Sequence, residues 1–368
     1  MLGAAGVVVA IYAAVQLALT GVATWVETRA EVYPWKDEDP LRYLLPTLFD
    51  ERGGDRILIM GPSEAREDLL YSRFDEAFPH LRAFQGALSL GKLDDTILTL
   101  EYLEGAYGAD AMPLVLVMGI TPRFVGNLPR DISLMSVAIN RYSPLYRVES
   151  TDGGSQVAAK TVWQGMAGRV RFSFKQQKRH HAALCSVLLW WTGADERDSA
   201  SSGVLSGVLS GVIQKLRFYR SPYKYHHLRP LRHETITRWL NDPYGFWHAV
   251  HAWNPSDDAS RIREDVRRLR EIARQHGIAL FVVNLPEHPE NRAGYRPGRY
   301  ERYLELLQES LGDTPFLNLR DMLSDAEFYD VGHATLAGAT RVTDRVIDFI
   351  KTEVDELSEA RIAKVKPP

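Results

Sequence analysis

The sequence predicts an α/β fold with a mostly parallel three-layer sheet, from two observations. Short apolar runs typical of buried strands occur at residues 56–60, 114–118, 278–285 and 316–319. Segments with helical apolar spacing lie between these runs, and a last one closes the fold. Strands that alternate with helices form parallel sheets covered by helices on both faces. Because such sheets bind ligands beyond the carboxyl ends of their strands, the residues that follow each run are the first site candidates.

The elements of the first half follow one another in the order strand, turn, helix. Residues 56–60 form the first predicted strand, Gly61-Pro62-Ser63 forms a tight turn, and a helix begins at Glu64. A second helix is predicted over 92–103, and it leads into the strand 114–118. Ser63 is therefore expected at the carboxyl end of a strand.

The second half repeats this order. Ser256 is predicted to cap a helix that Gly277 ends, and the strand 278–285 follows. The strand 316–319 precedes a loop with Asp330 and His333. A closing helix is expected to turn five apolar side chains inward: Leu336, Ala339, Val342, Val346 and Ile350.

The N-terminus predicts a membrane anchor. Residues 2–26 carry no charge, and about 20 apolar residues suffice to cross a bilayer as a helix. A cleaved signal peptide and a buried core helix are the alternatives. The charges that flank this segment do not set its orientation in the membrane.

The whole chain is expected to consist of six segments. They are an anchor at 1–27, a linker at 28–54, core segments at 55–131 and 256–356, a basic, aromatic and largely helical insertion at 132–255, and a tail at 357–368.

The charge distribution indicates which partners to expect, and the cysteine content excludes an intrachain disulfide. The 368 residues carry a net charge of −3, and the lone Cys185 excludes an intrachain disulfide. Between residues 160 and 238, 14 Lys and Arg face 4 Asp and Glu, an excess of +10 that leaves −13 for the rest. This excess predicts a cap that faces anionic lipid headgroups or an anionic polymer, with an ordinary solvated surface as the alternative. Nucleic acid is disfavoured as a partner because the whole chain is acidic.

Two motifs together predict serine chemistry. Gly61-x-Ser63 follows the first strand, and Asp330-x-x-His333 precedes the last helix. A serine hydroxyl needs an imidazole to take its proton, and a carboxylate must orient that imidazole. The alternative is a helix cap at Ser63 and a structural loop histidine at 333. His248-x-x-His251 has no acidic or cysteine partner nearby in the sequence, so no metal site is predicted.

These motifs resemble the SGNH/GDSL hydrolase superfamily, which has flavodoxin-like α/β/α folds. Gly61-Pro62-Ser63-Glu64, Ile120-Thr121-Pro122-Arg123-Phe124 and Asp330-Val331-Gly332-His333 are similar to blocks of its membrane-anchored branch, which includes the D-alanyl transfer protein DltD and polysaccharide O-acetylation proteins. Pro62 departs from that branch's serine, and the Gly-x-Asn-Asp block of soluble members is absent. The resemblance covers the anchor and about 200 residues of the α/β core, and it leaves the insertion out.

The resemblance implies an extracytoplasmic, membrane-anchored serine esterase or O-acyltransferase without cofactor. Ser63 would form an acyl-enzyme, His333 would be the base and Asp330 its orienter. Gly86 would donate a hydrogen bond to the oxyanion, and Arg123 would be a further donor, with Asn127 as the second choice for that position. The alternative role for Arg123 is a surface salt bridge. The substrate would be a cell-envelope polymer, and a multi-span membrane O-acyltransferase the partner. A non-catalytic scaffold that binds an anionic polymer or such a partner is the rival.

One further histidine is a candidate for the same cleft. His288 follows the predicted strand 278–285, so it is expected near the carboxyl edge of the sheet as a substrate-binding residue. A structural turn at Pro286-Glu287-His288-Pro289 is the alternative.

Overall fold

The computed structural model describes residues 56–126, 133–143, 146–151, 154–167, 231–242 and 246–365. The predicted anchor and linker lie outside these ranges, as do Asn127 and Cys185. Among the described residues, no helix combines the length and the apolar character that crossing a bilayer requires.

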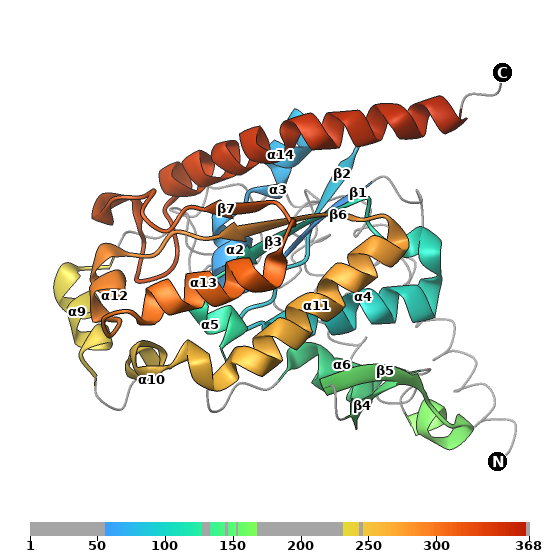
Figure 1. The fold of residues 1–368 in the computed structure, drawn as a ribbon, viewed down its shortest axis with the longest axis horizontal. Helices are drawn as coiled ribbons and strands as arrows, with labels where there is room; N and C mark the ends of the chain where they lie inside the picture. The colour runs from blue at the N-terminus through green and yellow to red at the C-terminus, as the bar shows by residue number, and fades with distance from the viewer. Residues whose placement is uncertain are drawn as a thin grey trace, which may run out of the picture. The chain divides into compact units, whose positions relative to one another are not determined.

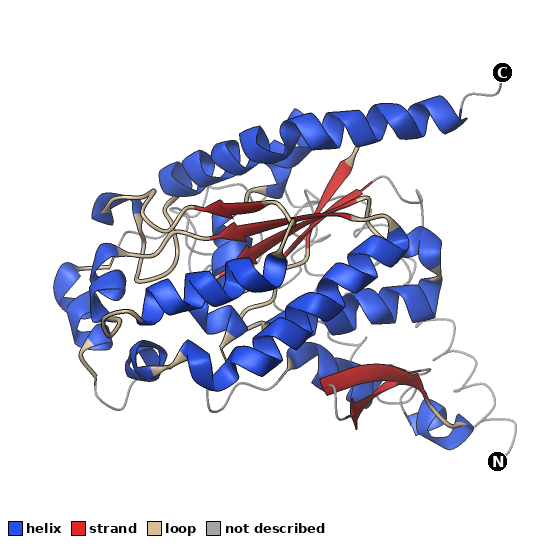
Figure 2. Cartoon of the chain, viewed as in Figure 1, coloured by secondary structure: helices blue, strands red, loops and turns tan. Residues whose placement is uncertain are grey.

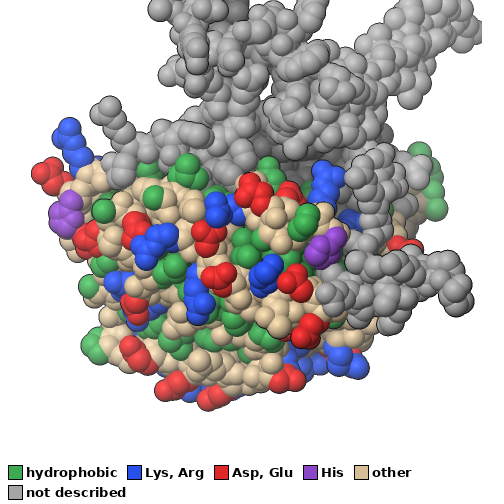
Figure 3. All heavy atoms as spheres, turned by 90° about the horizontal axis from the view of Figure 1, so that it is seen from above, with side chains coloured by type: hydrophobic (Ala, Val, Ile, Leu, Met, Phe, Trp, Pro, Cys, Tyr) green, Lys and Arg blue, Asp and Glu red, His purple; other side chains and the backbone are tan. Residues whose placement is uncertain are grey.

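The chain divides into two compact units. The larger holds residues 37–141, 145–160 and 223–368; of the smaller, the structure describes only residues 142–143 and 161–167. The basic excess of residues 160–238 therefore falls largely outside the described ranges. On the face drawn in Figure 3, basic and acidic side chains are interspersed over the described surface.

In the part of the chain that the structure describes, five parallel strands form the central sheet and confirm the α/β prediction (Figure 2). The sheet runs in the order β2-β1-β3-β6-β7. From β1 the chain passes to β2 on one side and then returns to β3 on the other, which makes the β1–β3 boundary the topological switch point where such sheets bind ligands. The strands are β1 (Arg56–Met60), β2 (Arg82–Gln85), β3 (Val115–Ile120), β6 (Ala279–Asn284) and β7 (Phe316–Asn318).

Helices cover both faces of this sheet (Figure 1). Side chains alternate along each strand, so Ile57 and Ile59 share one face while Leu58 and Met60 share the other, and all four are buried. The face of Ile57 packs in one core with residues of α2 (Ser63–Asp68), α3 (Tyr71–Ala77) and α14 (Leu336–Val365). The other face is covered by α4 (Leu93–Tyr107), α11 (Ala259–His276) and α13 (Arg299–Leu311).

The segment predicted as a largely helical insertion also contains an antiparallel hairpin. Its strands are β4 (Tyr146–Thr151) and β5 (Gly154–Ala159), paired over six residues each. The described helices of this segment are α6 (Leu134–Tyr142), a short helix at 162–167, α9 (His233–Leu240) and α10 (Phe246–Ala252). Two short helices complete the carboxyl edge of the sheet: α5 (Pro122–Val125) and α12 (Pro289–Gly294).

Two predictions about helix ends are wrong, and one is confirmed. Asn254, not Ser256, caps the short 3₁₀ turn Pro255–Asp258 that leads into α11. Leu336 is 48% exposed because it is the first residue of α14, whereas the four later apolar positions of that stripe are buried. Gly277 ends α11 with φ +63°, a left-handed cap that glycine adopts without strain.

Candidate functional site

The turn after β1 is built on a close approach of two glycines. Gly61 has φ +142°, and a Cβ there would lie 2.3 Å from the Gly119 carbonyl oxygen. A Cβ on Gly119 would in turn lie 2.7 Å from Cβ of Ala65. Without these side chains, α2 starts directly against the sheet. Ser63 is its first residue, at the carboxyl end of β1 as predicted.

Glu64 links Ser63 to Arg123. The Ser63 hydroxyl donates to Oε2 of Glu64 at 3.0 Å, and Nη2 of Arg123 donates to the same oxygen at 3.0 Å. Arg123 comes from α5 beyond β3, so the contact joins the two strands of the switch point. Glu64 and Arg123 are each about 5% exposed, which makes this a buried ion pair.

Asp330 holds His333 in a fixed orientation. The His333 Nδ1 lies 2.9 Å from both carboxylate oxygens of Asp330. The same carboxylate accepts the amides of Gly332 and His333, each at 2.9 Å. With Nδ1 committed to the carboxylate, Nε2 is the nitrogen left for proton transfer, the arrangement that a catalytic base requires.

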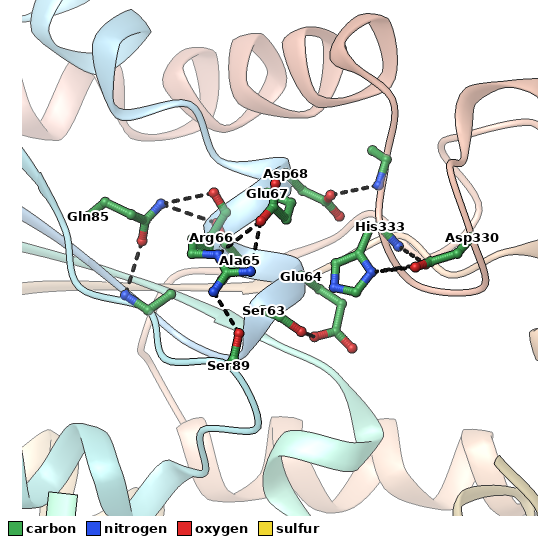
Figure 4. A network of polar contacts seen from close by, with 12 residues as sticks. Ser63, Glu64, Ala65, Arg66, Glu67, Asp68, Gln85, Ser89, Asp330 and His333 are labelled. Atoms are coloured by element: carbon green, nitrogen blue, oxygen red, sulfur yellow. Dashed lines mark hydrogen bonds and ion pairs between the residues drawn. The ribbon is translucent and has the colours of Figure 1, made fainter. Parts of the chain in front are cut away.

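Both halves of the predicted triad occupy one site (Figure 4). The His333 ring lies beside the Glu64 side chain, whose carboxylate accepts the Ser63 hydroxyl. A Cβ built on Gly332 would lie 3.4 Å from Cγ of Glu64, which confirms how closely the two segments approach. The structure thus brings Ser63, Asp330 and His333 together around Glu64, to which the sequence had assigned no role in the site.

The charged groups of this site shift one another's pKa values. Burial favours neutral forms, but the Asp330 carboxylate, with smaller contributions from Glu64 and Glu67, raises the pKa of His333 above its usual value of 6.5. Burial likewise disfavours the carboxylate of Glu64, yet Arg123 and then His333 hold the pKa of Glu64 below its usual range. Asp330 behaves in the same way: the pKa of its buried carboxyl is lowered by His333 and by the two backbone amides.

The predicted oxyanion donors are engaged elsewhere in this structure. The Gly86 amide donates to the Ile59 carbonyl oxygen at 2.6 Å, extending the β1–β2 ladder. Arg123 forms the ion pair with Glu64, which was the alternative interpretation of that residue. Asn127 lies outside the described residues. The Ser63 amide lies at the start of α2.

His288 has a structural role, which was the alternative to substrate binding, and its neighbour Glu287 lies nearer to the site. His288 is 3% exposed and caps α12, its Nδ1 accepting the Glu290 amide at 3.2 Å. Glu287 instead lines a small pocket together with Glu64, Arg123 and Gly332. Burial raises the pKa of Glu287 to about 7, even though the Tyr295 hydroxyl donates to it at 2.7 Å.

The acidic residues that surround the triad were missed because charged side chains in a helix are usually solvated. In the segment 63–68 every residue except Ser63 is buried. The available signal was a dense run of charge directly after a strand, at the edge of the sheet where ligands bind.

Comparison with known proteins adds little to this geometry. One protein-family model, whose description names no function, matches residues 257–355, about a quarter of the chain. The matched segment runs from α11 to α14 and includes Asp330 and His333, but not Ser63. No curated protein matches the sequence.

Proposed function

We propose that the chain is a membrane-anchored serine esterase or O-acyltransferase of the SGNH type. One observation carries this proposal. Ser63, after the turn that follows β1, lies in the same site as the Asp330–His333 pair, at the switch point of the sheet. The strand order of the sheet supports the finer fold assignment, because it is the flavodoxin-like order. An exported cell-envelope polymer is the proposed acceptor, and a multi-span membrane O-acyltransferase the proposed partner.

The proposed reaction begins when the Ser63 hydroxyl turns from Glu64 toward His333. Nε2 of His333 takes the proton while Oγ attacks the acyl carbonyl carbon, and the Ser63 amide donates to the developing oxyanion. The protonated His333 then gives its proton to the departing alcohol, leaving an acyl ester on Ser63. In the second half, water or an acceptor hydroxyl gives its proton to His333 and attacks this ester. His333 then returns the proton to Oγ of Ser63, which leaves as the free hydroxyl while the acid or new ester is released.

The first test is covalent labelling of the full-length protein with a fluorophosphonate, read by intact-protein mass spectrometry. We expect one adduct on the wild type and none on Ser63→Ala, because the reagent traps a serine whose proton a neighbouring base removes. Ser72→Ala is the matched control, since Ser72 is an exposed serine on the neighbouring helix α3. A well-folded wild type that stays unlabelled rules out the activated nucleophile.

The labelling rate is also expected to depend on pH through His333. Only the neutral imidazole can accept the Ser63 proton, and the carboxylates around His333 raise its pKa above 6.5. The rate should therefore increase with pH, with a midpoint above 6.5. In Asp330→Asn the largest raising influence is lost, so the midpoint should move down while the rate falls. A wild-type midpoint at or below 6.5 contradicts this electrostatic account.

A second candidate function is a non-catalytic scaffold that binds an anionic polymer or a membrane acyltransferase. The hydrogen bonds of the site favour it. The Ser63 hydroxyl donates to Glu64, and Arg123 is paired with the same carboxylate. The Gly86 amide donates to the Ile59 carbonyl oxygen. Under this alternative the network is purely structural. The labelling experiment separates the two, because a scaffold gives no Ser63 adduct.

A further inference from the structure

The C-terminal end of α2 carries a buried carboxyl group that the proposed reaction does not use. Asp68 is the last residue of that helix, and it is fully buried. Its Oδ1 accepts the amide of Ala334, the residue after His333, at 2.9 Å (Figure 4). Its other oxygen, Oδ2, is buried without a hydrogen-bond partner among the described residues.

This hydrogen bond connects the loop that carries His333 to the helix that carries Ser63. Ser63 begins α2 and Asp68 ends it, a rise of about 7.5 Å along the helix axis. The same end of the helix is fixed to α14, because the Thr343 hydroxyl donates to the Asp68 carbonyl oxygen at 3.1 Å and accepts the Leu70 amide at 2.9 Å. One short helix of six residues therefore carries the serine at one end and the anchor of the histidine loop at the other.

The charges around His333 indicate which form of Asp68 the site holds. On α2, Glu64 is paired with Arg123 and Glu67 is paired with Arg66 at 2.8 Å. Asp330 faces His333 from the loop itself. These three carboxylates and two guanidinium groups sum to −1, which a protonated His333 balances. Among these groups, an ionised Asp68 would then add a negative charge that nothing balances, at a fully buried position, which is costly.

We propose that Asp68 is a positioning residue that works as a neutral carboxylic acid, tying the His333 loop to the helix of the nucleophile without adding charge beside the imidazole. The proposal builds on the proposed function. The pKa of Asp68 is in accord with it: burial raises that pKa well above its usual value, against the opposing effects of the Ala334 amide and His333.

Two variants of Asp68 in the full-length chain test this proposal. Asp68→Asn keeps a carbonyl oxygen for the Ala334 amide and stays neutral, so we expect it to keep most of the labelling rate, with an unshifted pH midpoint. Asp68→Leu removes the acceptor and frees the loop from α2. We expect its labelling rate to fall at least tenfold and its midpoint to drop toward 6.5, as His333 moves away from Glu64 and Glu67.

The titration of His333 by NMR, with ¹³C-labelled histidine and His333→Gln for assignment, gives a readout that needs no activity. An ionised Asp68 would raise the proton affinity of His333, so a clear downward shift in Asp68→Asn overturns the neutral form. Unchanged rate and midpoint in Asp68→Leu overturn the positioning role. If Asp68→Leu does not fold, the Asp68→Asn titration still decides the charge state. If the wild type is not labelled, the proposed function fails while the titration still tests Asp68.

Discussion

Replacing Gly61 by alanine is expected to lower the free energy of unfolding by roughly 3 to 5 kcal/mol, through backbone strain and overpacking together. The backbone at this position has φ +142°, where residues with a side chain are strained. The new methyl group would also sit 2.3 Å from the Gly119 carbonyl oxygen and 2.6 Å from Cβ of Ala65. Since both neighbours are fixed in β3 and α2, relief requires the helix of Ser63 to move off the sheet.

Gly277→Ala separates the two contributions to this effect. Gly277 also has positive φ, at +63°, but no atom of the described residues lies within 4 Å of a Cβ built there. Its substitution should therefore cost only the backbone strain, about 1 kcal/mol. Urea unfolding of the full-length proteins, followed by tryptophan fluorescence, measures both. Equal losses in the two variants would contradict the close packing of β1, β3 and α2.

Most of the sheet could be predicted because its strands are continuous apolar runs bounded by turn residues. The predicted strand 56–60 agrees with β1, and the runs at 114–118, 278–285 and 316–319 each overlap an observed strand. Strand β2 was not recognised. Its sequence Arg-Ala-Phe-Gln is short and only partly buried. Among the described strands it lies at the edge of the sheet and pairs only with β1. Such a strand is specified by its partner more than by its own composition.

The sequence predicted those site residues whose position follows from the order of strands along the chain. It did not predict those whose role depends on the burial of their side chains. Ser63, Asp330 and His333 could be placed at the carboxyl edge of the sheet from the strands that precede them. The roles of Glu64, Asp68 and Glu287 could not, because an acidic residue is usually solvated and only the packed structure shows that these three are buried. Gly86 was assigned to the oxyanion by resemblance, whereas its amide extends the ladder to Ile59.

Arg123→Met is expected to destabilise the protein by about 3 to 5 kcal/mol at pH 7, because it leaves the Glu64 carboxylate buried without its guanidinium partner. The double variant Arg123→Met/Glu64→Gln should recover much of this loss, since it removes the unpaired charge as well. Arg73→Met is the matched control. This substitution breaks the ion pair between Arg73 and Asp344, whose N–O distance of 2.7 Å is similar. Because these two side chains are 38% and 46% exposed, the loss should cost about 1 kcal/mol or less.

The pH dependence of the Arg123→Met effect identifies its cause. In the wild type the pKa of Glu64 is lowered, so this residue adds stability above its unfolded pKa near 4.5 and loses that contribution as the pH falls. In the variant, burial without Arg123 should raise the pKa of Glu64, so the folded state binds the extra proton and the penalty shrinks in acid. The difference in unfolding free energy between wild type and variant should therefore be largest near pH 7 and narrow toward pH 4. A difference that does not change over this range would mean that Arg123 stabilises the site by packing of its side chain, and not by pairing with Glu64.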